Sequence, residues 1–393
     1  MAKDYFPSPH PLTPPHSEED TLSWLRLLRS RRVGISTFYR LLAEHGSAQE
    51  ALAALPDIAR DAGVSSYQIC PEGVVLAELK AGRLAGARLI ANGQPGYPAA
   101  LSDLADAPPL IWVRGNKALL GRPMIALVGA RNASSLGMRM ARKMAGELAE
   151  AGYIVVSGLA RGIDTAAHQA ALERGTVAVM AGGVDVIYPA ENAVLAQEIE
   201  TRGLLLSEQP IGLAPMARHF PMRNRIISGL SEAVVVIEAA PKSGSLITAR
   251  NALDQGRDVL AVPGHPLDAR AGGSNMLIRD GATLVRSAAD VIEALADLAP
   301  KVAAAQRHDA PDPAAISPDA PPAQPAPPKM PRSLAELAAL HSEILGRLGP
   351  SPLAEDQLMR DLNLNLREIT PALTDLELEG KIARQPGGLL SIR

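Results

Sequence analysis

The stretch MIALVGARNASSLGMRMARKMAGELAEAGYIVVSG, residues 124–158, decides the fold of this chain. It begins with a short apolar run, continues with a segment of helical periodicity, and ends with a second apolar run rich in β-branched residues. A strand, a helix and a second strand in this order form a βαβ unit. The two strands of such a unit lie parallel in one sheet.

The same alternation continues to about residue 300. Further apolar runs are TVAVMAGG (176–183), LLLSEQP (204–210), AVVVIEAA (233–240) and DVLAVPG (258–264), with helical segments between them. Strands that are apolar along their whole length are typical of a parallel sheet covered on both faces. We therefore predict an α/β fold with a doubly wound, Rossmann-like sheet over residues 92–300, in which residues 92–120 add an edge element.

The residues before this domain divide into a tail and a helical module. Residues 1–19 are rich in proline and predict a disordered tail, whereas residues 20–91 have helical periodicity and predict an N-terminal helical domain. Within it, RRVGISTFYRLLAEHGSAQEAL (31–52) reads as a short helix, a turn containing glycine and a second helix. We interpret this segment as a packing module. A helix-hairpin-helix contact with DNA is the less favoured alternative.

The residues after the sheet domain predict a linker and a small domain. Residues 301–332 contain nine prolines and nine alanines, a composition that favours extended linkers. Residues 333–393 read as three helices and a hairpin that turns at Gly387-Gly388, which is the winged-helix pattern. Nine acidic residues stand against six basic ones from Ser333 onward, so we expect a protein-contact or regulatory role for this domain, with duplex DNA as the less favoured ligand.

Composition limits the classes of protein to which this chain can belong. The 393 residues carry a net charge of -3, so a nucleic-acid site has to be a local patch rather than a global basic field. One cysteine, Cys70, excludes a disulfide framework and a cysteine-based zinc site. The sequence has neither a signal core nor an apolar run of the ~20 residues that span a bilayer. We expect a soluble cytoplasmic protein with no membrane contact.

The loops that follow the strands hold the candidate ligand site, because ligands of open α/β sheets bind beyond the carboxyl ends of the strands. These loops are VGARNASSLG (128–137), SGLARGID (157–164), AGGVDVIYP (181–189), SEQP (207–210) and EAAPKSGSLITA (238–249). They are rich in glycine, serine and arginine, and backbone amides in such turns bind phosphate oxygens. We predict a ligand with several phosphates. The dinucleotide glycine pattern with its acidic partner and the Walker A order are both missing, which argues against an NAD site and a P-loop.

A basic stretch gives the second indication. Residues 209–231 contain no aspartate or glutamate but include Arg218, Arg223 and Arg225, together with Phe220. Arginines beside an aromatic ring are typical of single-stranded nucleic-acid binding, in which charge meets the backbone and the ring meets a base. The alternative is that the ring anchors a loop and that the arginines are solvated or cap helices.

The candidates for catalysis are weaker. Asp164 and His168 lie four apart on a predicted helix, where a capping aspartate beside a hydrogen-bonded core histidine is the favoured interpretation. Glu208 and Glu238 follow strands and would act as bases or pair with nearby arginines. No nucleophile–base pair and no set of metal ligands emerges. We therefore predict a protein that is not an enzyme and has no metal or organic cofactor.

Several motifs together resemble one family. VGAR-x-x-S, SGLARGID-x-x-AH, Gly-Gly followed by IYP, LLSE, FP-x-RNRIISGLS, VVVIEA, KSGSLITA and VPG are similar to the DprA (Smf) family over about Ala126 to Val285. The resemblance implies a dimeric protein that binds single-stranded DNA in natural transformation and loads the RecA recombinase onto it. It also implies an N-terminal SAM-like module and a C-terminal winged helix.

The resemblance assigns single-stranded-DNA contacts to individual positions. They are Arg131, Ser157, Gly158, Arg218, Phe220, Arg223, Asn224, Lys242, Gly244 and Ser245. Such contacts address the backbone and the faces of bases, so little sequence specificity is expected. The alternative function is a nucleotide-phosphate hydrolase similar to the lysine-decarboxylase-like phosphoribohydrolases. The segment KSGSLIT departs from the PGG-x-GT loop of those enzymes.

Overall fold

The computed structural model describes residues 14–64, 66–296, 334–348, 352–385 and 389–392. It separates into two compact units, Met1–Ala288 and Ala289–Arg393. The predicted linker over residues 301–332, the turn at Gly387-Gly388 and most of the predicted tail lie outside the described residues.

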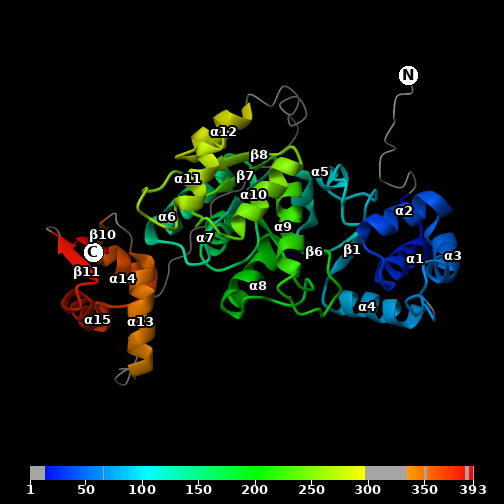
Figure 1. Ribbon diagram of the computed structural model, residues 1–393, viewed down its shortest axis with the longest axis horizontal. Coiled ribbons are helices and arrows are strands. Elements are labelled where there is room, and N and C mark those ends of the chain that lie inside the picture. Colours follow the sequence, from blue (N-terminus) through cyan, green and yellow to red (C-terminus); the bar gives the residue numbers. More distant parts are fainter. Residues whose placement is uncertain (1–13, 65, 297–333, 349–351, 386–388, 393) are drawn as a thin grey trace, which may run out of the picture. The chain divides into compact units, whose positions relative to one another are not determined.

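Four helices open the larger unit (Figure 1). They are α1 (Glu18–Arg29), α2 (Ile35–His45), α3 (Ala48–Asp61) and α4 (Glu72–Leu84). Ser17 and Asp20 form a capping box that starts α1. Trp24, Phe38 and Tyr39 meet edge to face, with ring centroids 5.2 and 5.5 Å apart, in the core of these helices.

A sheet of nine strands follows, in the spatial order β1-β2-β6-β5-β4-β3-β7-β8-β9. The strands are β1 (Arg88–Ala91), β2 (Leu110–Gly115), β3 (Met124–Val128), β4 (Ile154–Ser157), β5 (Thr176–Val179), β6 (Leu204–Ser207), β7 (Ala233–Val236), β8 (Asp258–Ala261) and β9 (Thr283–Leu284). Strands β3 to β9 are parallel, whereas β1 and β2 are antiparallel additions at one edge. The predicted doubly wound sheet is confirmed. Residues 88–91, which we had placed at the end of the helical domain, form a strand of this sheet.

Helices cover both faces of the sheet. One face packs against α6 (Ser135–Glu150), α7 (Ile163–Ala171) and α8 (Ala193–Arg202), and the other against α5 (Ala99–Ser102), α9 (His219–Leu230) and α10 (Ser245–Asp254). Alternate residues of β5 show this division, because Val177 and Val179 lie in the core under α9 and Ala178 lies in the core under α8. The short turns η1 (Lys117–Gly121), η2 (Leu172–Arg174) and η3 (Ala190–Asn192) and helix α11 (Gly272–Arg279) complete this unit.

The strand order reverses direction beside β3. The chain passes from β3 through α6 to β4 on one side, while β7 pairs with β3 on the other side. In open α/β sheets this switch point leaves a crevice beyond the carboxyl ends of the two central strands. The loops after β3 and β7 therefore face the same crevice.

The smaller unit is a winged helix. After α12 (Ala288–Ala296), it consists of α13 (Leu334–Arg347), β10 (Leu353–Ala354), α14 (Glu355–Leu362), α15 (Leu366–Leu378), β11 (Ile382–Gln385) and β12 (Leu389–Ile392). The three strands form an antiparallel sheet in the order β10-β12-β11. Ile344, Leu358 and Leu373 are fully buried where the three helices meet. The predicted three helices and hairpin are confirmed.

Candidate nucleic-acid interface

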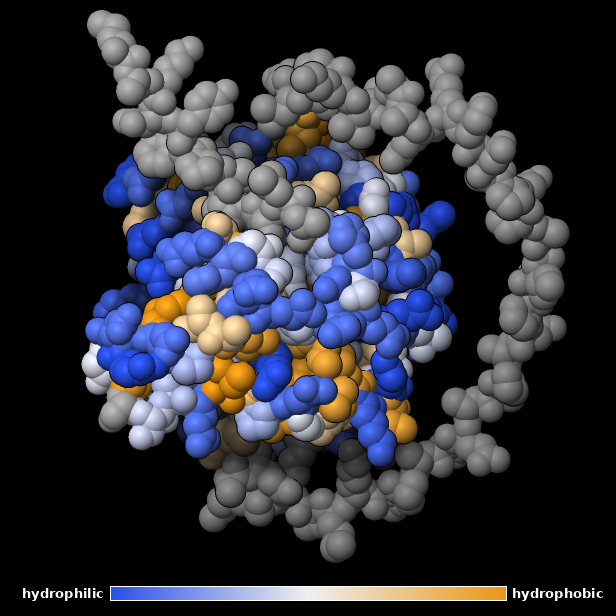
Figure 2. Space-filling model, turned by 90° about the vertical axis from the view of Figure 1, so that its right-hand side faces the viewer, coloured by the Kyte–Doolittle hydropathy of each residue, from blue (hydrophilic) through white to orange (hydrophobic). Residues whose placement is uncertain are grey.

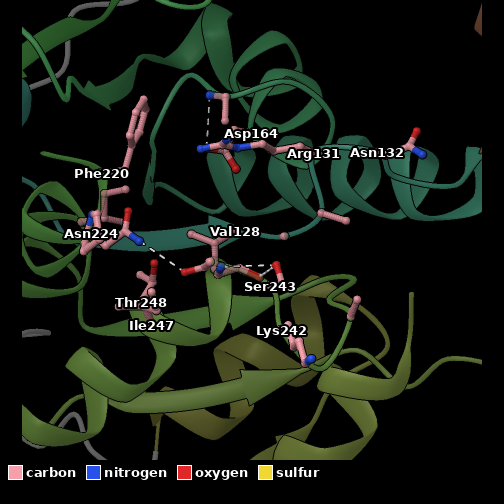
Figure 3. Close-up of a pocket in the computed structure, with 18 of the residues that line it drawn as sticks. Val128, Arg131, Asn132, Asp164, Phe220, Asn224, Lys242, Ser243, Ile247 and Thr248 are labelled. Carbon is pink, nitrogen blue, oxygen red and sulfur yellow. Dashed lines mark hydrogen bonds between the residues drawn. The ribbon is translucent and has the colours of Figure 1, made fainter. Parts of the chain in front are cut away.

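A pocket of about 570 Å³ lies at the switch point of the sheet (Figure 3). Its walls come from the loops after β3, β4 and β7, from α9, from the start of α10 and from Arg270 before α11. Seven of the ten predicted contact residues line it: Arg131, Phe220, Arg223, Asn224, Lys242, Gly244 and Ser245. Segments that are more than a hundred residues apart in the sequence thus meet in one place.

The pocket lining is strongly positive. Four of its residues are cationic, namely Arg131, Arg223, Lys242 and Arg270, and a single carboxylate, Asp164, opposes them. Arg131 and Lys242 are exposed. Arg270 is half-buried and donates to Asp268 over 3.1 Å. The exposed cations available to an anionic ligand are therefore Arg131 and Lys242.

An aromatic wall stands beside Arg131. Its guanidinium carbon lies 5.2 Å from the centre of the Phe220 ring, a cation–π distance. Tyr188, which is 50% exposed, places its ring 5.7 Å from that of Phe220. The sequence motif IYP contains Tyr188, but we had given this residue no role. The signal by which the sequence could have revealed Tyr188 is an aromatic residue in a loop that follows a strand.

The start of α10 forms the opposite wall. The N-cap residue of this helix is Gly244, which has no side chain, and the amide of Ser245 donates to Ser243 Oγ over 3.4 Å. Asn224 donates to the Gly244 carbonyl over 3.3 Å, and the hydroxyls of Ser243 and Ser245 lie 2.7 Å apart. The amides of Leu246 and Ile247 donate to carbonyls of the same turn, so the donors that this wall offers to phosphate oxygens are Lys242 and the two hydroxyls.

Arg223 lies beneath the pocket rather than at its mouth. The side chain is buried, and Nη1 donates to the Val179 carbonyl over 2.6 Å. The guanidinium packs so closely on Gly158 that a β carbon at this position would clash with it. Burial lowers the pKa of Arg223 to about 10, while the charge of Asp164 acts in the opposite direction. At neutral pH this arginine is therefore a buried cation under the site.

Asp164 holds the loop after β4. Its Oδ2 accepts hydrogen bonds from the amides of Gly158 over 3.1 Å and Ala160 over 3.3 Å. Burial raises the pKa of this carboxyl, and the charge of Arg223 opposes that rise. The carboxylate thus holds the loop before α7 and offsets the buried charge of Arg223. The interpretation of Asp164 as a helix cap is wrong, because the N-cap residue of α7 is Gly162 and no side chain caps this helix.

His168 holds the middle of the same loop. Its Nε2 accepts from the amide of Leu159 over 3.3 Å, and its Nδ1 lies 2.8 Å from Thr176 Oγ1, which donates to the Val155 carbonyl. These partners define a neutral ring protonated on Nδ1. Burial lowers the pKa of His168 to about 3. Both ring nitrogens are engaged, so His168 has a structural role.

Three predicted contact residues lie away from the pocket lining. Ser157 is fully buried, and its hydroxyl donates to the Leu127 carbonyl over 2.7 Å. The amide of Gly158 donates a hydrogen bond to Asp164, and the Arg223 guanidinium packs against this glycine. Arg218 is exposed at the residue before α9, outside the pocket. The sequence placed Ser157 and Gly158 at a strand end, but their polar groups are used within the fold.

The basic stretch before β7 is only partly a surface patch. Arg225 is buried, pairs with Glu208 and lies 3.4 Å from Asp106. Of the three arginines in this stretch, only Arg218 is exposed. Glu208 thus pairs with an arginine, which was one of the two roles open to it from the sequence.

The start of α6 is occupied by a carboxylate of the chain itself. Glu238 follows β7 and accepts from the amide of Ser134 over 3.0 Å and from its hydroxyl over 2.6 Å. Ser134 Oγ in turn accepts from the amide of Gly137. Burial raises the pKa of Glu238. In dinucleotide-binding folds the first helix after the first strand receives the pyrophosphate at this position, so the site for such a ligand is filled.

Comparison with known proteins decides the family. The model of DNA recombination-mediator protein A matches residues 88–296, that of the DprA-like N-terminal HHH domain matches residues 18–81, and that of the DprA winged helix domain matches residues 317–388. The chain belongs to the DprA/Smf family. The resemblance inferred from the strand-end motifs is thereby confirmed, and the helical module that we expected to be SAM-like matches the HHH model of the DprA family.

Two named relatives with similar sequences support this family membership. DNA processing protein DprA of Streptococcus pneumoniae is 48% identical over 198 residues, which cover 50% of this chain and 70% of that protein. Protein Smf of Escherichia coli is 37% identical over 300 residues, which cover 76% of this chain and 75% of that protein.

Two solved DprA structures resemble the fold. The X-ray structure of the Streptococcus pneumoniae DprA aligns with a TM-score of 0.56 and 39% identity over 65% of this chain and 91% of that one. The DprA of Helicobacter pylori, whose structure concerns its single-stranded-DNA-binding mode, aligns with a TM-score of 0.50 and 30% identity over 54% of this chain and 96% of that one. Among the described residues of this DprA family member, no helix is long and apolar enough to cross a membrane.

Proposed function

We propose that this DprA family member binds single-stranded DNA through the pocket at the switch point of its sheet. Two exposed cations, Arg131 and Lys242, line the pocket together with a half-buried ring, Phe220. The start of α10 adds the hydroxyls of Ser243 and Ser245. Cations and hydroxyls suit phosphates, and an aromatic face suits an unstacked base. This combination in one pocket is the observation that carries the proposal.

Binding through these groups is largely independent of base sequence. Arg131 and Lys242 address the backbone, and Phe220 addresses the face that all bases share. Asn224, whose amide would be able to read a base edge, donates to the Gly244 carbonyl. Arg223 is a buried positive charge beneath the pocket, where its side chain donates to the Val179 carbonyl and its charge is offset by Asp164.

The family suggests a role for the bound strand, because the family model that matches the chain is that of a DNA recombination-mediator protein. We propose that the bound strand is handed to the RecA recombinase during DNA uptake in natural transformation. This proposal is supported by the family membership and by the strand-binding chemistry of the pocket. The homodimer and the surface that contacts RecA stay predictions.

Fluorescence anisotropy of a labelled oligothymidine tests the proposal. We expect tight binding that weakens steeply with salt, because each phosphate neutralised in a single strand contributes about -0.7 to the slope of log K against log salt concentration. Lys242→Ala should weaken binding and reduce this slope by about 0.7. The matched control is Lys143→Ala, which removes an exposed lysine from the middle of α6. Equal affinity of the parent protein and both variants would refute the site.

For the alternative function, hydrolysis of a nucleotide phosphate, two carboxylates that the structure describes in and beside the pocket already accept hydrogen bonds from the fold. Asp164 accepts from two amides of its own loop, and Glu238 accepts from Ser134. We therefore propose that the pocket binds without catalysing a reaction. Turnover of nucleoside monophosphates by the purified protein, lost in Lys242→Ala, would reverse this ranking.

A further inference from the structure

The pocket at the switch point encloses only part of a single strand. Its volume of about 570 Å³ is in the range that one drug-sized ligand fills, whereas a strand of DNA continues in both directions. Single-strand sites in OB folds cover about 4–16 nucleotides, which is more than a pocket of this size encloses. The nucleotides that flank the pocket therefore lie on a neighbouring surface.

Two helices that begin beside the pocket are candidates for this surface. α6 follows the loop after β3 and α10 follows the loop after β7, and they cover opposite faces of the sheet. Neither residues 129–146 nor residues 239–253 contain an aspartate or a glutamate. Each helix also carries an exposed arginine a little over one turn from its first residue, Arg139 on α6 and Arg250 on α10. Charge along the helices alone does not distinguish them.

The start of α6 is unfavourable for a phosphate. The buried carboxylate of Glu238 lies there and accepts hydrogen bonds from the amide and the hydroxyl of Ser134. None of the described residues of α6, Ser135–Glu150, lines the pocket. A strand that turned towards Arg139 would thus pass a carboxylate and leave the pocket lining before it reached the arginine.

The start of α10 is favourable. Lys242 precedes this helix, and the hydroxyls of Ser243 and Ser245 lie 2.7 Å apart at its beginning. Ile247, which is 42% exposed, lines the pocket from the first turn of α10 (Figure 3). An exposed apolar side chain suits a base, as apolar side chains suit the methyl group of thymine. The lining of the pocket therefore continues onto the outer face of α10.

Arg250 comes next on this face. It follows Ile247 by three positions, and residues with this spacing are neighbours on the surface of a helix. Its side chain is exposed, and within the described part of the chain it takes part in no ion pair. An exposed guanidinium donates two parallel hydrogen bonds to a phosphate. Asp254, one turn further on, is also exposed and ends the acid-free surface.

We propose that the single strand leaves the pocket along the outer face of α10, where Ile247 contacts a base and Arg250 binds a backbone phosphate. With a rise of about 1.5 Å per residue, Arg250 lies about 7.5 Å beyond Ser245 along the helix axis, so only a strand that extends out of the pocket reaches it. The inference rests on the proposed function, because it extends the same binding site.

The test measures how the effect of Arg250 depends on the length of the strand. Anisotropy over a salt series is recorded for labelled oligothymidines of about 4 and about 16 nucleotides. Arg250→Ala should weaken binding of the long strand and lower its salt slope by about 0.7, the contribution of one phosphate. The short strand, which the pocket holds, should bind almost as it does to the parent protein. Lys242→Ala should weaken binding of both.

Two further variants change the charge without removing the arginine. Asp254→Asn should strengthen binding of the long strand, because it removes the carboxylate that repels phosphates at the end of this surface, and it should leave the short strand unaffected. Arg250→Lys, which keeps the charge, should keep most of the salt slope. Circular dichroism and melting temperature confirm that each variant is folded.

Two controls delete an exposed arginine elsewhere. Arg139→Ala is the closest match, since it removes an arginine at the corresponding place of α6 on the other face of the sheet. Arg40→Ala removes one from α2 that lies 4.0 Å from Glu44. Figure 2 looks onto the side of the molecule on which Figure 1 shows α1 to α4, and hydrophilic side chains cover much of this face. Both controls should bind both oligothymidines like the parent protein.

The outcomes separate this inference from the proposed function. Three results would overturn the inference and leave the pocket as the binding site: no loss for the long strand in Arg250→Ala, an equal loss for both strands in this variant, or an equal loss for the long strand in Arg139→Ala. If neither oligothymidine binds to the parent protein, the proposed function is refuted and the inference with it.

Discussion

Replacing Phe220 with alanine, singly and together with Arg131→Ala, separates stacking from charge at the pocket. A ring that stacks on a base contributes about 1–3 kcal/mol, so Phe220→Ala should weaken oligothymidine binding by about 5- to 150-fold. The salt slope should not change, because the ring neutralises no phosphate. Arg131→Ala should instead lower the slope by about 0.7.

The double variant measures whether the two side chains act together. Arg131 lies 5.2 Å from the ring centre, and a cation–π contact at an exposed site is worth about 0.5–1 kcal/mol. The two losses should therefore depart from additivity by about that amount in a double-mutant cycle. The assay is anisotropy over a salt series for the parent protein, both single variants and the double variant.

Two results would refute this reasoning. A lower salt slope in Phe220→Ala would mean that the ring acts by positioning a cation rather than by stacking. Strict additivity, with a loss below twofold for Phe220→Ala, would mean that the ring anchors a loop, which is the alternative that the sequence left open.

Three further predictions concern the fold around the site. Because His168 is neutral in the fold with a pKa of about 3 and titrates near 6.5 when unfolded, its contribution to stability is complete above pH 6.5 and is lost as the pH falls towards 3. Between pH 6.5 and 5 this group should lower the free energy of unfolding by about 2 kcal/mol. Denaturant titrations at both pH values measure the change. If His168→Gln has the same pH dependence of stability as the parent protein, the assignment is contradicted. Gly158→Ala should displace the Arg223 guanidinium and lower both the melting temperature and the affinity for oligothymidine, whereas Gly146→Ala, where a β carbon meets nothing, is the control. Glu208→Gln should cost about 3–5 kcal/mol of stability, since it leaves the buried Arg225 without its main partner, and a change below 1 kcal/mol in chemical unfolding would show that Asp106 suffices.

The sequence predicted the sheet well because its strands are buried on both faces. Runs such as AVVV at 233–236 have no polar alternation, and every residue of this strand is buried. The antiparallel strand β1 was placed in the neighbouring domain, because its four residues, RLIA, carry too short a pattern to separate from the helix before them. Its partner β2 begins 19 residues after β1 ends, within the segment 92–120 that the sequence predicted to add an edge element.

The site was predicted less completely than the fold. The strand-end loops contained Arg131 and Lys242, the basic stretch contained Phe220, and all three line one pocket. Strand-end position failed to distinguish loops that face the pocket from loops that satisfy their own polar groups, so Ser157 and Gly158 were included. The burial of Arg223 and Arg225 also escaped the sequence, since an arginine on an acid-free stretch looks exposed until its distant partners, the Val179 carbonyl and Glu208, are known.

The carboxylate of Glu238 at the start of α6 has a consequence for small nucleotides. A free dinucleotide that approached this helix would compete with an anion tethered to the same fold, whose effective concentration far exceeds that of a metabolite in solution. Displacing it would also leave the Ser134 amide and hydroxyl to be satisfied anew. A long strand that binds at α10 and along the loop after β3 avoids this competition. The carboxylate thereby disfavours a free dinucleotide at the start of α6.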